Sequence, residues 1–179
     1  MPTLIRILIC LFFCLSAVHT DHAFGQNDPS RHLDAPPVEN TGLNFNDLKT
    51  LLKSAKSATV FVFQPGQMGL KPLDSLAIQD REELSRKTWK RLKKAMLRQS
   101  GYDFSMYKNC LFHPAAGLRL RTKTGRSDVL MDFTCDTWYL YDEKAGFRQF
   151  EADDMHDIVL EQIHVLFPET QTRLKLRHQ

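Results

Sequence analysis

The alternation of apolar and polar side chains between Ala116 and Cys135 limits the fold of this chain more than any other feature. The stretch reads AGLRLRTKTGRSDVLMDFTC, in which two apolar-rich runs flank a polar centre. A two-residue turn at Thr124-Gly125 would join the runs as a β-hairpin, with Arg121 opposite Asp128. The apolar pairs expected to share the other face are Leu120 with Val129, Leu118 with Met131, and Ala116 with Phe133. A one-residue slip would turn this apolar set to water, so the pattern predicts a hairpin with one buried face.

Helical and strand periodicities on either side of the hairpin complete the expected fold. The segments 44–58, 80–101 and 153–169 show helical spacing of apolar residues, and 58–63, 137–141 and 147–150 are typical of strands. The expected helix caps are Asn44 or Asn46, a capping box of Asp80 with Glu83, a left-handed stop at Gly101, and Asp153 or Asp154. After Cys135 the alternation changes phase, which predicts a bulge or tight turn near Asp136-Thr137. The sequence therefore predicts an α+β fold: a single antiparallel meander sheet of about five strands with three helices packed on it.

The N-terminus predicts export. A twelve-residue apolar run, ILICLFFCLSAV, follows Arg6 and is short for a membrane span, which needs about 20 residues. We expect residues 1–25 to be a signal peptide, cut after Gly25 or after Thr20, with an uncleaved anchor as the alternative. The expected location is periplasmic or extracellular, with no transmembrane span once the signal is removed.

Three further segments follow the expected signal peptide. Residues 26–43 are rich in Pro, Asp and Asn and predict a flexible leader. A single α+β domain is expected over 44–168. The basic tail, 169–179, is expected to be an edge strand or a solvated end.

Charge and motifs exclude several classes of function. The chain has 24 Lys and Arg against 21 Asp and Glu, a net charge of +3, which is far from that of a dedicated nucleic-acid binder. The sequence contains no sequence-specific nucleic-acid motif, phosphate loop, dinucleotide fingerprint or serine nucleophile motif, and we expect no cofactor. These observations favour a function other than catalysis.

The cysteines leave three alternatives with a chemical or structural role. Two of the four lie inside the expected signal peptide, so the mature chain keeps Cys110 and Cys135. An even count in an exported chain favours a disulfide between them. Alternatively, Cys110, His113 and Cys135 could bind a metal, completed by His156, Asp136 or water. The third alternative is a thiol enzyme in which His113 activates a cysteine; otherwise the two thiols are inert and buried.

The same stretch carries a family resemblance. Its residues are Cys110-x3-Pro114, the run Gly117-Leu118-Arg119-Leu120, Asp128–Met131, and Phe133-Thr134-Cys135-Asp136. They resemble a group of small exported bacterial proteins of unknown function, with a Cys-x3-Pro, a hairpin and a Cys-Phe-x-Cys. The layout of residues 45–167 agrees with this group, but Asp132 stands where the group has the first cysteine of the second motif. The resemblance implies a fold and no activity, and a three-cysteine site of the group would be reduced here to Cys110 and Cys135.

The remaining charged candidates lie on the second helix and in the hairpin. The second helical segment is strongly basic, and Lys87, Lys90, Lys94 and Arg98 could form a basic surface for an anionic polymer or membrane. Asp132 and Asp136 flank Cys135, and we expect Asp132 to pair with basic side chains. The sequence thus predicts an exported, non-enzymatic binding or interaction module stabilised by a disulfide. The alternatives are a metal- or thiol-dependent protein and a basic-surface binder, and the sequence names no ligand or partner.

Overall fold

The computed structural model describes residues 43–106, 108–172 and 174. The predicted signal peptide, nearly all of the flexible leader and most of the basic tail lie outside these residues. The described residues form an α+β fold with one antiparallel sheet of six strands and three α-helices. The predicted fold class is confirmed, and the sheet has one strand more than the expected five.

The first helix and strand begin where the sequence predicts. Helix α2 spans Phe45–Ser54, and the Asn44 side chain accepts the N–H groups of Asn46 and Asp47. The Asp47 carboxylate accepts the Asn44 N–H in return, so the N-terminus has a reciprocal capping box. Strand β1, Ser57–Phe63, follows after a short connection, and most of its side chains are buried.

The predicted capping box of Asp80 with Glu83 is wrong. Both residues belong to strand β2, Ile78–Glu83, which pairs antiparallel with β1 and forms one edge of the sheet. Its six side chains are all exposed, so it shows no apolar alternation. Charged side chains on an edge strand discourage pairing with other chains.

Helix α3 begins six residues later than predicted and ends earlier. It spans Arg86–Met96, and the Ser85 hydroxyl caps it by accepting the Thr88 N–H. The predicted left-handed stop at Gly101 is also wrong, because Gly101 lies in a later 3-10 helix, η2 (Gln99–Gly101), and packs against Met155. A Cβ at this position would collide with the Met155 side chain, which explains a glycine without a left-handed turn.

The central hairpin has the predicted faces and a different register. Strands β3, Ala116–Arg121, and β4, Arg126–Met131, pair with Leu118 opposite Val129 and Arg119 opposite Asp128. The predicted pairing of Arg121 with Asp128 is therefore wrong by two residues. The turn begins at Thr122, whose hydroxyl accepts the N–H groups of Thr124 and Gly125. This side-chain bond moves the turn centre one residue back along the chain, which shifts every pair by two and leaves each residue on its predicted face.

The last strands and helix follow the expected order. Strands β5, Thr137–Asp142, and β6, Gly146–Glu151, complete the sheet order β2-β1-β3-β4-β5-β6. Asp136, which has a positive φ of 56°, forms the tight turn predicted between β4 and β5. Helix α4 spans His156–Leu166 and follows a 3-10 helix, η3, at Asp153–Met155, and it has no side-chain cap from Asp153 or Asp154.

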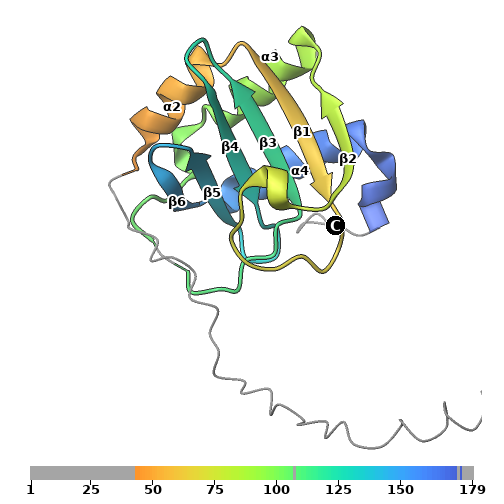
Figure 1. The fold of residues 1–179 in the computed structure, drawn as a ribbon. Coiled ribbons are helices and arrows are strands. Elements are labelled where there is room, and N and C mark those ends of the chain that lie inside the picture. Colours follow the sequence, from red (N-terminus) through yellow and green to blue (C-terminus); the bar gives the residue numbers. More distant parts are fainter. Residues whose placement is uncertain (1–42, 107, 173, 175–179) are drawn as a thin grey trace, which may run out of the picture. The chain divides into compact units, whose positions relative to one another are not determined.

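The helices cover one face of the sheet, as predicted. The main core lies between this face and the helices, and Leu52, Leu92 and Leu160 contribute to it from the helix side. The other face carries a second apolar cluster around Phe63 and Tyr139, which also includes Leu73 from the connection between β1 and β2. Figure 1 shows α4 behind the strands and the short helix η1, Leu73–Ser75, in front of them.

The chain continues in contact with α4 beyond Pro168. A 3-10 helix, η4, spans Pro168–Thr172, and Leu174 is buried. The imidazole Nε2 of His164 lies 2.7 Å from the Leu174 carbonyl oxygen. Among the described residues, no helix is long and apolar enough to cross a membrane.

Candidate functional site

Cys110 and Cys135 form a disulfide. It joins the segment before β3 to the turn between β4 and β5, and the two Cα atoms are 6.6 Å apart. Cys110 is exposed and Cys135 is half-buried. In this form neither sulfur is a thiolate, so neither can serve as a nucleophile or as an anionic metal ligand. The metal and thiol alternatives with His113 apply to the reduced protein and stay predictions.

Asp132 organises the turn that holds the disulfide. Its carboxylate is fully buried and accepts hydrogen bonds from the Thr134 N–H, the Thr134 hydroxyl and, at 2.8 Å, the His113 N–H. The predicted pairing of Asp132 with basic side chains is wrong, because backbone N–H groups and a hydroxyl satisfy it. A buried carboxylate held in this way fixes His113 beside the β4–β5 turn and so keeps the two cysteines close.

A buried histidine and aspartate lie on the other side of the same turn. His156, at the start of α4, makes a hydrogen bond through Nδ1 to Asp136 Oδ1. The two residues are only 2% and 4% exposed, and the Phe133 ring contacts the imidazole edge-on. Because solvent and substrate cannot reach this pair, its arrangement favours a structural link between the turn and α4 over acid–base catalysis.

No metal-binding cluster is present in the part of the chain that the structure describes. There, no three or more histidine, cysteine, aspartate or glutamate side chains are grouped so that they could hold an ion. The proposed fourth ligands, His156 and Asp136, bond to each other.

A polar network that the sequence did not reveal connects β6 to the segment before the disulfide. Lys108 Nζ lies 2.9 Å from Glu151 Oε2 and 2.8 Å from Asp153 Oδ1. Glu151 is only 1% exposed, and its other carboxylate oxygen, Oε1, accepts hydrogen bonds from the Thr137 hydroxyl and the Gln149 amide. Burial disfavours the charged ammonium, yet the hydrogen bonds of Asp153 and Glu151 outweigh it and raise the pKa of Lys108. The network holds β5, β6 and the Lys108 segment together.

A second network lies on the sheet face opposite the helices. Arg119 Nε and Nη2 donate to the two carboxylate oxygens of Asp128, each at 2.8 Å, and Nη1 lies 2.8 Å from Asp74. The hydrogen bond of Asp128 raises the pKa of Arg119 despite burial, and the hydrogen bond from Arg119 lowers the pKa of Asp74. The guanidinium also stands 5.6 Å from the centre of the Phe61 ring. Because Asp74 belongs to η1, this network fastens the covering segment to the sheet.

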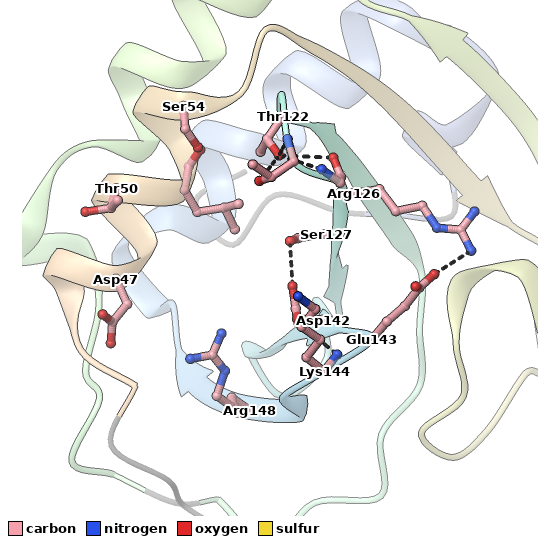
Figure 2. Close-up of a pocket in the computed structure, with 13 residues that line it drawn as sticks. Asp47, Thr50, Ser54, Thr122, Arg126, Ser127, Asp142, Glu143, Lys144 and Arg148 are labelled. Atoms are coloured by element: carbon pink, nitrogen blue, oxygen red, sulfur yellow. Dashed lines mark hydrogen bonds and ion pairs between the residues drawn. The ribbon is translucent and has the colours of Figure 1, made fainter.

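A polar pocket of about 480 Å³ lies at one end of the sheet. It lies between α2, the β3–β4 turn and the β5–β6 turn, and Figure 2 shows its side chains. Its hydroxyl-bearing side chains are Thr50, Ser54, Thr122, Thr124 and Ser127. Its charged side chains are Asp47, Arg126, Asp142, Glu143, Lys144 and Arg148. The lining is more polar than apolar, so the pocket suits a polar ligand.

Most of these charges are already bonded within the protein. Arg126 lies 3.1 Å from Asp74 and 3.2 Å from Glu143. Asp142 accepts the Ser127 hydroxyl and the Lys144 N–H. Arg148 differs from these, because its Nε is buried and has no hydrogen-bond partner among the described residues.

Sequence reasoning did not identify Arg148, although the chain contains a signal for it. In the strand sequence GFRQFE, Arg148 has the same parity as Phe150, which lies in the main core. A cation on the strand face that otherwise points to the core is unusual, because a charge removed from water needs a partner.

The four predicted basic-surface residues lie on or just beyond α3, and all are exposed: Lys87, Lys90, Lys94 and Arg98. Within the described ranges none of them forms an ion pair. Lys94 and Arg98, together with Arg91 and Gln162 of α4, also line a hollow of about 270 Å³. The described residues that line this hollow include three cations and no carboxylate.

Comparisons with known proteins are sparse. No protein-family model matches the chain, and no curated protein matches it. One solved structure is similar, the "Crystal Structure of Putative Lipoprotein from Clostridium perfringens", with a TM-score of 0.45 and 9% sequence identity. The match covers 69% of this chain and 93% of that chain. The predicted membership of the group with the Cys-Phe-x-Cys pattern stays a prediction.

Proposed function

We propose that this chain is an exported, non-enzymatic binding or interaction module, stapled by the disulfide between Cys110 and Cys135. The disulfide carries the proposal, because such bonds form and persist in oxidising compartments outside the cytoplasm. The buried pair of Asp136 and His156 supports it, since this hydrogen-bonded carboxylate and imidazole, which could otherwise act as an acid and a base, are closed to substrate. An open polar pocket and a basic helix face offer surfaces for binding instead.

The first test is the intact mass of the protein, native and denatured, after export with its own N-terminus. We expect a chain that starts at Gln26 or Asp21 and is two hydrogens lighter than the reduced form. A protein with two free thiols and a stoichiometric metal ion in the native mass would instead support the site of Cys110, His113 and Cys135.

A second candidate function is binding to anionic surfaces through α3. It is favoured by the hollow of Arg91, Lys94 and Arg98, in which three cations converge without a carboxylate. Arg91 and Lys94 lie three residues apart on α3, where like charges repel each other, and an anion would relieve that repulsion.

Vesicles that contain phosphatidylglycerol provide the test of this candidate. We expect binding to fall by about tenfold or more as salt rises from about 50 to about 200 mM, because binding depends on counterion release. The double substitution Lys90→Glu and Lys94→Glu is expected to abolish binding. The matched control, Lys53→Glu with Lys56→Glu, makes the same change of charge beside α2 and is expected to leave binding within about twofold of the unmodified protein. Equal losses in both variants would show that only net charge matters.

A further inference from the structure

We propose that the pocket in Figure 2 binds a small hydroxylated monocarboxylate, with the Arg148 guanidinium as its anchor. This proposal gives the binding module a ligand class and rests on the proposed function.

Arg148 lies at the margin of the main core. In β6 it shares a sheet face with Phe150, and across the strand pair it lies opposite Leu140, whose side chain belongs to the same core. The helices cover this face, and the Nε of Arg148 is shielded from solvent with no acceptor among the described residues. A buried N–H donor such as this Nε, which gives up water without gaining an acceptor, costs the folded protein free energy. A ligand oxygen in the pocket would supply that acceptor.

The pocket's own carboxylates do not take this role. Asp47 accepts the Asn44 N–H in the helix cap, and Asp142 accepts the Ser127 hydroxyl and the N–H groups of the β5–β6 turn. Neither forms an ion pair with Arg148 within the range that the structure describes. The arginine thus lies among acids that are engaged elsewhere, and none of the described carboxylates serves as the acceptor of its Nε.

The surrounding charges select the kind of anion. Guanidinium groups bind carboxylates and phosphates through two parallel hydrogen bonds. However, Asp47, Asp142 and Glu143 all line the pocket, and they would repel a dianion such as a phosphate monoester more than a single carboxylate. Lys144 is exposed at the rim and can support one negative charge.

The hydroxyl groups that line the pocket indicate which groups the ligand carries besides its carboxylate. Thr50, Ser54 and Thr124 contribute hydroxyls from α2 and from the β3–β4 turn. Hydroxyl groups both donate and accept hydrogen bonds, so they match a polyhydroxylated ligand better than an apolar one. A cavity of about 480 Å³ is in the size range of small-molecule sites.

Calorimetric titration with gluconate tests the proposal, with glucose and glucose 1-phosphate as comparison ligands. We expect saturable gluconate binding with a Kd of about 1 mM or tighter, and at least tenfold weaker binding of the other two ligands. Arg148→Gln is expected to weaken gluconate binding at least tenfold. Arg148→Lys is expected to weaken it less, because lysine keeps the positive charge but cannot form two parallel hydrogen bonds to a carboxylate. The matched control, Arg81→Gln on β2, removes one exposed guanidinium and is expected to bind as the unmodified protein does.

Amide shifts of the unmodified protein give a second measurement that needs no variant. Gluconate is expected to shift amides of α2 and of residues 122–127 and 142–148. Shifts confined to other parts of the chain, absence of saturable binding, equal binding of glucose, or an Arg148→Gln variant that binds normally would each overturn the proposal. None of these results would affect the mass measurement, which tests export and the disulfide separately.

Discussion

Replacing both Cys110 and Cys135 by serine is expected to lower the free energy of unfolding by about 3 kcal/mol. The disulfide spans 25 residues of sequence, and this loop contains β3 and β4, the two central strands of the sheet. Without the bond, the unfolded chain gains the freedom to separate these positions, and the folded state keeps its other contacts. Urea denaturation of the oxidised protein and of the double variant measures the difference.

Two controls separate the disulfide from the metal alternative. Reduction of the unmodified protein is expected to cause a similar loss, and the double variant is expected to be insensitive to reductant. His113→Ala is expected to cost far less, because the bond from His113 to Asp132 uses the backbone N–H, which the substitution keeps. A chelator that destabilises the reduced protein, together with a large effect of His113→Ala, would contradict the disulfide interpretation.

The central hairpin shows how much of the fold the sequence determines. Alternation with a period of two assigned Leu118 and Val129 to the buried face correctly, because any shift by an even number of residues preserves the faces. The alternation alone does not distinguish between strand registers that differ by two residues. That choice depends on the Thr122 hydroxyl, a local bond that apolar pattern does not encode.

The edge strand was missed for a different reason. Asp80 and Glu83 have the spacing of a capping box, yet they lie on β2, whose side chains are all exposed. A strand without a buried face has no periodicity of its own, and only its backbone pairing with β1 defines it. The cap that does form, at Ser85, has Thr88 and no acidic residue three positions later, so it does not match the capping-box pattern.

The sequence predicts some of the candidate sites and does not predict others. The pairing of Cys110 with Cys135 could be predicted, because two cysteines remain after the expected signal peptide and have one way to join. The pocket around Arg148 could not, because α2 and two separate turns contribute to it. The ion pair of Lys108 with Glu151 likewise joins residues that are 43 positions apart and that no sequence motif connects.

Arg119→Ala is expected to destabilise the protein by about 3 kcal/mol, because it leaves the Asp128 carboxylate buried without its cation. Asp128 is only 2% exposed and receives two hydrogen bonds from Arg119 at 2.8 Å. The substitution also removes the contact of Arg119 with Asp74, which holds η1 over the second face of the sheet. The midpoint of urea denaturation measures the loss.

The matched variants distinguish a buried charge from lost packing. Asp74→Ala removes the half-exposed partner of the same arginine and is expected to cost less than about 1 kcal/mol, as exposed ion pairs do. The double substitution Arg119→Met and Asp128→Leu removes both charges and is expected to cost less than Arg119→Ala alone, because no buried ion is left unpaired. If the double variant were as unstable as the sum of its single substitutions, the loss would arise from packing around Phe61 and Leu73 and not from an uncompensated carboxylate.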